Sequence, residues 1–167
     1  MKERPKLQPP PDGATPLSIL IAEDEEDDAL LLQHAFEKAA SEVPLHIVQN
    51  GKQVLDYLKG DFPFDDRSAH PMPSLLLLDL KMPLMDGFEV LEWLRAHPEF
   101  RRLVVVVFSG SDQPVDIERA CALGAVRYLV KPPKPTDLLQ MVRTVEKFWH
   151  KISSEVACIP EQAAVRV

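Results

Sequence analysis

Leu75-Leu76-Leu77-Leu78-Asp79-Leu80-Lys81-Met82-Pro83 is the stretch of the sequence that decides the fold. Four consecutive leucines followed by turn-forming residues are typical of a strand that is buried on both faces of a parallel sheet. The aspartate stands at the carboxyl end of this strand, where open α/β sheets bind their ligands. We therefore predict a strand over 75–79, with Asp79 as the reactive residue of the domain.

Four more apolar segments along the chain have the length of strands, and amphipathic segments lie between them. We predict the other strands at 17–22, 45–48, 103–108 and 127–130. Apolar residues at helical spacing predict a helix after each strand, and the last helix begins near Pro135 or Thr136. Five strands that alternate with five helices predict an α/β fold, in which right-handed crossovers make a doubly wound parallel sheet.

The length of 167 residues favours one domain with tails. Residues 1–16 hold five prolines and little apolar sequence, which predicts a disordered tail. The domain is expected over 17–152, and the remaining tail, 153–167, is too short for an output domain.

The charge and the apolar runs exclude some classes of partner. A net charge of −7 disfavours nonspecific nucleic-acid binding, which depends on Lys and Arg contacts to phosphates. The sequence shows no secretory signal and no apolar run near the roughly 20 residues of a membrane helix. We therefore expect a cytoplasmic protein with neither nucleic acid nor membrane as a partner.

Polar residues follow four of the five predicted strands. Glu23 and Asp24 follow the first strand, Asp79 ends the third, and Ser109 and Lys131 follow the fourth and fifth. Because the carboxyl ends of parallel strands share one edge of the sheet, these residues should meet in one crevice. Three carboxylates at close range repel one another, and a divalent cation such as Mg²⁺, which prefers oxygen ligands, relieves this repulsion. The pattern therefore predicts a hard-metal site.

Each of these residues also has a plainer interpretation when it is considered alone. A single acid after a strand is more often a helix N-cap or a solvated turn residue. Ser109 could likewise be a cap and Lys131 a surface charge. The coincidence of all five residues at predicted strand ends favours a shared site over five independent roles.

The motifs around these residues resemble the response-regulator receiver domain of two-component signalling, over residues 17–152. The matching motifs are Glu23-Asp24, Asp79 within Leu-Leu-Asp-Leu-Lys-Met-Pro-Leu-Met-Asp-Gly, Ser109-Gly110, and Tyr128-Leu129-Val130-Lys131-Pro132. The resemblance implies a flavodoxin-like (βα)5 fold with strand order 2-1-3-4-5. It also implies a cis peptide bond between Lys131 and Pro132.

The resemblance assigns the acidic residues to phosphoryl and metal chemistry. Asp79 would be the phosphoacceptor, a carboxylate nucleophile that takes a phosphoryl group from a sensor histidine kinase. Mg²⁺, or Mn²⁺ in its place, would be bound by Asp24, Asp79 and the backbone carbonyl of Lys81. Glu23 would act mainly through metal-bound water. The chain would catalyse its own phosphorylation and dephosphorylation, although its main task would be that of a signalling switch.

Three further residues receive roles from the same resemblance. Lys131 would place a positive charge on a phosphoryl oxygen, and Ser109 would donate a hydrogen bond to the same group. When Ser109 moves toward the phosphoryl group, Tyr128 would rotate inward into the vacated space. The surface of the fourth helix, fifth strand and fifth helix would then change, which shifts a two-state equilibrium.

The end of the last predicted helix resembles the stand-alone regulators that partner phytochrome-type kinases. The features that carry this resemblance are Phe148-Trp149-His150, Ile152, Ile159-Pro160, the acidic run 23–28 and the long loop at 60–73. Output would then pass through contacts with a downstream protein or a phosphorelay partner. The apolar stripe of this helix is either the seam of a homodimer or part of the core of its own chain.

Three other functions use related features. A phosphatase with an aspartate nucleophile resembles the pattern Asp-x-Asp, but Lys81 stands where the second acid would be. A flavin or nucleotide binder needs a Gly- or Ser/Thr-rich phosphate loop after the first strand, whereas this loop is acidic. A degenerate receiver that acts only as a docking module should lack site residues, and none of the five is missing.

Overall fold

The computed structural model describes residues 18–39 and 43–151. The strands are β1 (Ile19–Ala22), β2 (Leu45–Val48), β3 (Leu75–Leu78), β4 (Val104–Ser109) and β5 (Arg127–Val130). The helices are α1 (Glu26–Ala39), α2 (Gly51–Lys59), α3 (Gly87–Ala96), α4 (Pro114–Ala122) and α5 (Leu138–Lys151), with short 3₁₀ turns at Pro98–Phe100 and Pro135–Asp137. Within these residues no helix combines the length and the apolar character needed to span a bilayer.

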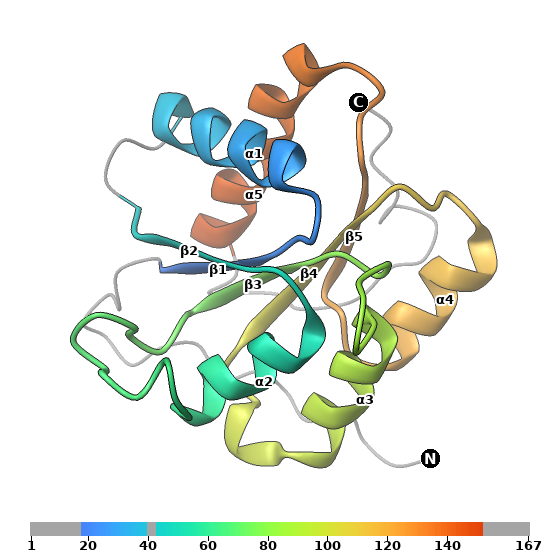
Figure 1. Ribbon diagram of the computed structural model, residues 1–167. Coiled ribbons are helices and arrows are strands. Elements are labelled where there is room, and N and C mark those ends of the chain that lie inside the picture. The colour runs from blue at the N-terminus through green and yellow to red at the C-terminus, as the bar shows by residue number, and fades with distance from the viewer. Residues whose placement is uncertain (1–17, 40–42, 152–167) are drawn as a thin grey trace.

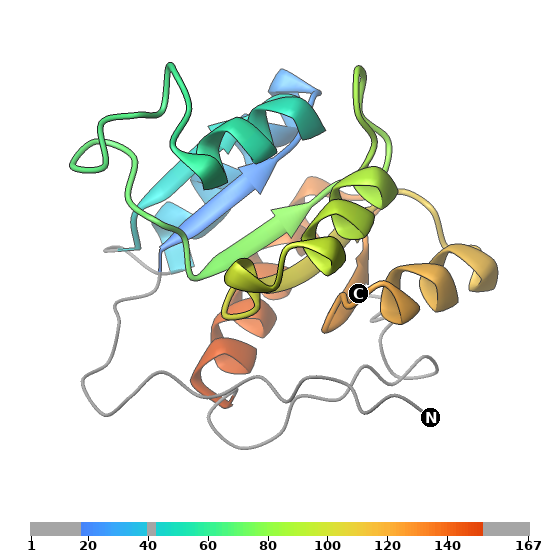
Figure 2. The ribbon, with the colours of Figure 1, turned by 90° about the horizontal axis from the view of Figure 1, so that it is seen from below.

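The strands form one parallel sheet in the order β2-β1-β3-β4-β5, which confirms the predicted doubly wound fold and strand order. Helices α1 and α5 cover one face of the sheet, and α2, α3 and α4 cover the other (Figures 1 and 2). Because all neighbouring strands are parallel, their carboxyl ends lie along the same edge.

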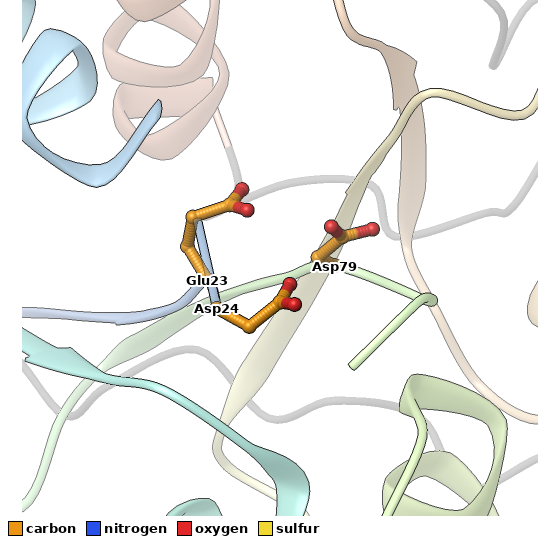
Figure 3. Close-up of side chains that lie close together, drawn as sticks. All are labelled: Glu23, Asp24 and Asp79. Atoms are coloured by element: carbon orange, nitrogen blue, oxygen red, sulfur yellow. The ribbon is translucent and has the colours of Figure 1, made fainter. Parts of the chain in front are cut away.

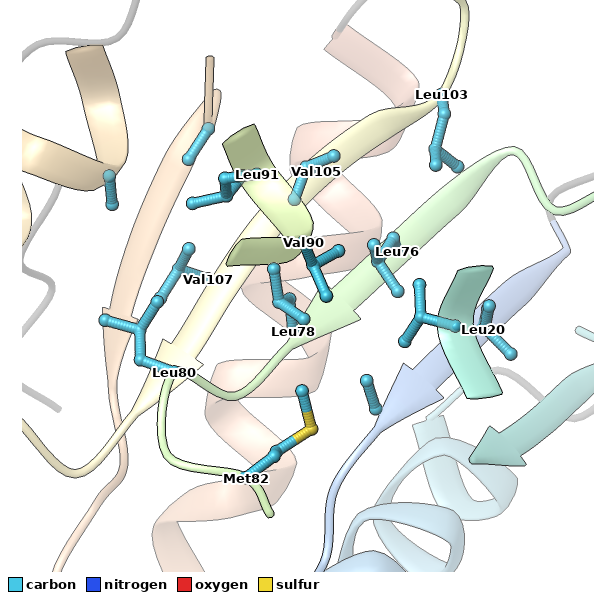
Figure 4. Packing of buried hydrophobic residues seen from close by; sticks show 14 of the residues in the cluster. Leu20, Leu76, Leu78, Leu80, Met82, Val90, Leu91, Leu103, Val105 and Val107 are labelled. Carbon is cyan, nitrogen blue, oxygen red and sulfur yellow. The ribbon is translucent and has the colours of Figure 1, made fainter. Parts of the chain in front are cut away.

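Strand β3 lies in the middle of the sheet, and each of its leucines is fully buried. Leu75 and Leu77 belong to the apolar cluster beneath α1 and α5. Leu76 and Leu78 point to the opposite face, where they pack with Val90 of α3 (Figure 4). Burial on both faces explains why this strand is apolar at every position instead of alternating with polar residues.

The predicted strand limits shift by one or two residues at several ends. The first strand begins at Ile19, β3 ends at Leu78, and β4 extends to Ser109. Asp79 is thus the first residue after its strand, although its N–H still donates to the Ala22 carbonyl at 3.0 Å. The segment predicted to start the last helix at Pro135 is instead a 3₁₀ turn, and α5 starts at Leu138.

The cis peptide bond recorded among the described residues is Phe62–Pro63, so the implied cis bond at Lys131–Pro132 is not observed. The predicted tails, 1–16 and 153–167, and the domain limits at Leu17 and Ile152 lie outside the described residues.

The segment between α2 and β3 is a long loop that is tied to the end of α2. The Arg67 guanidinium donates hydrogen bonds to the carbonyls of Tyr57, at 2.8 Å, and Leu58, at 2.7 Å. These carbonyls lie in the last turn of the helix, where the usual partners of the helical ladder are missing, and the Tyr57 carbonyl also accepts a hydrogen bond from the N–H of the C-cap Gly60 at 3.2 Å. The Tyr57 hydroxyl in turn donates to the Pro71 carbonyl at 3.1 Å, so the loop is anchored to α2 at Arg67 and again at Pro71.

Candidate functional site

Three carboxylates converge at the carboxyl edge of the sheet (Figure 3). Glu23 and Asp24 follow β1, and Asp79 follows β3, the strand beside it. One carboxylate oxygen of each residue lies within 4.8 Å of the others. The structure therefore brings together the three acids that the sequence places at strand ends.

Burial makes this cluster electrostatically costly. Glu23 is 1% exposed and Asp79 is 5% exposed. Burial raises the pKa of Glu23 to about 7, because Lys131 offsets only part of the cost of desolvation and Asp79 adds repulsion. The site thus holds more negative charge than its surroundings compensate.

The ammonium group of Lys131 is the cation of this site. Its Nζ lies 2.7 Å from Glu23 Oε2, 3.0 Å from Asp79 Oδ2 and 3.1 Å from Asp28 Oδ2. Burial alone would lower the pKa of Lys131, but the hydrogen bond to Glu23 and the charge of Asp79 raise it above its usual value. Lys131 is therefore a permanent positive charge next to the oxygen atoms of Asp79.

Asp28 belongs to this site, although the sequence analysis named it only as a member of the acidic run 23–28. It lies in the first turn of α1, within a run of six acidic residues at 23–28. No feature of that run distinguishes Asp28 from its neighbours. Its contact with Lys131 depends on how α1 is placed beside the end of β5, which is a property of the tertiary structure.

Ser109 and Tyr128 are connected through the backbone of Ser111. Ser109 is fully buried, and its hydroxyl oxygen accepts a hydrogen bond from the Ser111 N–H at 3.3 Å. Tyr128 is also fully buried, and its hydroxyl donates to the Ser111 carbonyl at 2.9 Å. A movement at Ser109 can therefore reach Tyr128 through Ser111, a residue that sequence reasoning missed.

The turn after Asp79 binds the carboxylate oxygen that does not face Lys131. The backbone N–H of Lys81 donates to Asp79 Oδ1 at 3.2 Å, while the Lys81 side chain is exposed. Asp79 Oδ2 faces Lys131, so each carboxylate oxygen has a defined neighbour. The backbone carbonyl of Lys81 as a metal ligand stays a prediction.

A divalent cation fits this set of donors. Carboxylate oxygens are the ligands that Mg²⁺, Mn²⁺ and Ca²⁺ prefer. Glu23 Oε2 is buried, and its partner within the described part of the chain is the Lys131 ammonium at 2.7 Å, which Asp28 and Asp79 share. A second positive charge would offset the burial that raises the pKa of Glu23 and the smaller repulsion from Asp79. The residues that would hold the ion are Glu23, Asp24 and Asp79.

When a chelator keeps the site free of metal, the free energy of unfolding of the wild type is expected to depend on pH through Glu23. Glu23→Gln is expected to remove this dependence. With a pKa near 7 in the folded state and near 4.5 when unfolded, protonated Glu23 contributes stability below about pH 4.5. This contribution is lost as the pH rises through about 7. The wild type should lose about 2 to 3 kcal/mol more than the variant between pH 5 and pH 8.

Urea unfolding at the two pH values measures this difference. Glu25→Gln is the matched control, because Glu25 is exposed and keeps its backbone hydrogen bond to Glu23. Equal pH slopes for the wild type and Glu23→Gln would contradict the expected burial cost.

The fold and the residues at its carboxyl edge define the class of protein. A five-stranded flavodoxin-like sheet that brings together acids, a buried serine and a lysine at strand ends is the architecture of a receiver domain. The family model described as response regulator receiver domain matches residues 19–143. The chain therefore belongs to the response regulator receiver domain family of two-component systems.

Solved structures of related proteins agree with this assignment. Response regulator RPA3017, in red light signaling of R. palustris, is 36% identical with a TM-score of 0.76, over 84% of this chain and 98% of that chain. The phosphorylated cyanobacterial phytochrome response regulator RcpA is 30% identical with a TM-score of 0.74, over 81% and 94%. The Mn²⁺-bound form of Rcp1, a protein of Synechocystis, is 32% identical with a TM-score of 0.72, over 80% and 94%. The expected similarity to phytochrome-associated regulators is thus confirmed.

Proposed function

We propose that this protein is a response regulator that accepts a phosphoryl group on Asp79 from a histidine kinase in a Mg²⁺-dependent reaction. The observation that carries the proposal is the placement of Asp79. Its carboxylate is buried, lies 3.0 Å from the Lys131 ammonium and is close to two further acids. A carboxylate in this setting is a nucleophile beside the charges that a transferring phosphoryl group requires.

The transfer itself needs little covalent chemistry from the protein. An oxygen atom of Asp79 forms a bond to phosphorus, the bond from phosphorus to the donor histidine nitrogen breaks, and that nitrogen keeps its electron pair. The Lys81 N–H and the Lys131 ammonium fix the orientation of the carboxylate before the donor arrives. Lys131 then stabilises the negative charge on a phosphoryl oxygen, and Ser109 donates a hydrogen bond to another.

The metal ion in this proposal is Mg²⁺, held by Glu23, Asp24 and Asp79, with the Lys81 carbonyl as a further ligand. When bound, it would supply positive charge to the phosphoryl oxygens. Mn²⁺ would also be accepted, and the Mn²⁺-bound form of the related Rcp1 supports this.

The output would be a change in the surface formed by α4, β5 and α5. The linkage from Ser109 through Ser111 to Tyr128 connects the phosphoryl site to β5. Tyr128 is already buried in this structure, so an inward rotation of its ring would have to begin from a different conformation. The switch role of Tyr128 therefore stays a prediction.

The partners in this proposal are a phytochrome-type histidine kinase and a downstream protein or phosphorelay partner. The related regulators of red light and phytochrome signalling support the kinase assignment. A receiver domain over 17–152 that signals in the cytoplasm through protein contacts fits the same proposal. The homodimer seam on α5 has less support, because Phe148 and Trp149 pack against the core of their own chain.

The experiment that tests the proposal is incubation of the full chain with acetyl phosphate and Mg²⁺. We expect the intact mass to increase by one phosphoryl group, and we expect no increase when EDTA removes the metal. An unchanged mass with Mg²⁺ present would overturn the proposal and would favour the docking-module alternative.

A further inference from the structure

Asp28 differs from the other carboxylates around Lys131 in its exposure. The side chains of Glu23 and Asp79 are 1% and 6% exposed, whereas that of Asp28 is 44% exposed. Asp28 nevertheless holds the ammonium at 3.1 Å, almost as closely as Asp79 does. Lys131 therefore has two buried partners and one that remains in contact with water.

The number of N–H groups on Lys131 limits how many anionic groups can accept a hydrogen bond from it. An ammonium group has three N–H donors, and three carboxylates already surround this one. A phosphoryl group on Asp79 would take the place of the Asp79 carboxylate charge, and it would carry up to about two negative charges on several acceptor oxygens. The anionic groups around the ammonium would still number three, but a second phosphoryl oxygen can accept an N–H of Lys131 only when one of the other two carboxylates releases it.

Asp28 is the carboxylate that can withdraw at the lowest cost. Glu23 is enclosed, so the loss of Lys131 would leave a buried charge without a partner. Asp28 can exchange the ammonium for water, because nearly half of its side chain is exposed. A cavity of about 150 Å³ adjoins the pair and gives the Asp28 side chain room to move.

We propose that Asp28 is a positioning residue that competes with the phosphoryl group for Lys131, an inference that rests on the proposed function. In the resting site Asp28 helps to hold the ammonium over Asp79. Its negative charge lowers the affinity of the site for an anion at Asp79 and raises the affinity for a divalent cation. Asp28 thereby sets the balance between the metal-loaded resting state and the phosphorylated state.

The test compares Asp28→Asn with the matched variant Asp27→Asn in the full chain. Both changes remove one negative charge from the first turn of α1, so their effects on the helix dipole cancel in the comparison. Asp27 is exposed, and the ion pairs of Lys131 within the described residues are with Glu23, Asp28 and Asp79 instead. The difference between the two variants therefore reports the contact between Asp28 and Lys131.

Two probes of opposite charge separate this role from a purely structural one. Calorimetric titration with Mg²⁺ alone measures cation binding, and titration with beryllofluoride at saturating Mg²⁺ measures binding of an anion that mimics a phosphoryl group. For Asp28→Asn we expect beryllofluoride affinity to increase about two- to fivefold and Mg²⁺ affinity to decrease by a similar factor. Asp28→Glu keeps the charge and should restore both values toward those of the wild type.

The outcomes distinguish this inference from the proposed function. If the wild type binds beryllofluoride and Asp28→Asn behaves like Asp27→Asn, the inference is overturned and the proposed function stands. A loss of affinity for both probes would show a structural role and would also overturn it. If the wild type itself does not bind beryllofluoride, the proposed function is overturned. The inference that Asp28 competes with a phosphoryl group for Lys131 is then overturned as well.

Discussion

Asp79→Asn is expected to abolish phosphoryl uptake and, at the same time, to stabilise the folded protein. Asparagine has nearly the same size as aspartate, so the surroundings of β3 can remain unchanged. Its amide cannot act as the carboxylate nucleophile, and no phosphoryl group should be gained from acetyl phosphate. The removal of one charge from three neighbouring acids relieves repulsion, while Lys131 keeps Glu23 and Asp28 as partners. The expected gain is about 1 to 2 kcal/mol in the absence of metal.

Intact-mass measurement after treatment with acetyl phosphate and Mg²⁺ measures the phosphoryl uptake. Urea unfolding in EDTA measures the free energy of unfolding. Asp112→Asn is the matched control, because Asp112 is exposed and lies just beyond the end of β4, at the same edge of the sheet. This control should leave both quantities unchanged. Full phosphoryl uptake by Asp79→Asn would mean that another residue is the acceptor.

The fold and the central residues of the site could be predicted because they depend on local pattern. An uninterrupted apolar run such as 75–78 identifies a strand buried on both faces, and the alternation with helices makes the sheet parallel. A parallel sheet then forces the residues after each strand to the same edge. This is why the sequence pattern alone groups Glu23, Asp79 and Lys131.

The residues that escaped prediction are those placed by packing between distant segments. Asp28 is one acid among six in sequence, and only the position of α1 relative to the end of β5 selects it. Ser111 acts through its backbone N–H and carbonyl, groups that every residue except proline carries. Arg67 anchors the loop to the last turn of α2, and its spacing from that turn follows no helical or strand period.

Gly87 shows the same dependence on packing, and it gives the largest stability change that we expect for a residue without a charge. It begins α3 directly after the N-cap Asp86, whose side chain accepts a hydrogen bond from the Glu89 N–H. The Gly87 N–H donates to the Leu80 carbonyl at 3.0 Å, which joins the start of α3 to the turn after Asp79. A Cβ atom at Gly87 would overlap the Asp79 carbonyl oxygen and lie 2.7 Å from Leu80 Cα.

Gly87→Ala is therefore expected to destabilise the protein by about 2 to 4 kcal/mol. The overlapping atoms belong to the backbone, so no change of side-chain rotamer can relieve the contact, and α3 must move away from the turn. Urea unfolding at pH 7 measures the change. Because the displaced backbone is that of Asp79 itself, the affinity for Mg²⁺ should fall as well, in a calorimetric titration performed below the unfolding transition.

Gly110→Ala is the matched control, because a Cβ atom at Gly110 would have no neighbour within 4 Å. Gly110 also lies at the carboxyl edge of the sheet, directly after β4, so a general intolerance of side chains at this edge would affect both variants. We expect its stability to stay within about 0.5 kcal/mol of the wild type. Equal stabilities for the two variants would mean that the start of α3 can shift freely, and that the close contact with the Asp79 backbone does not fix the position of the phosphoryl acceptor.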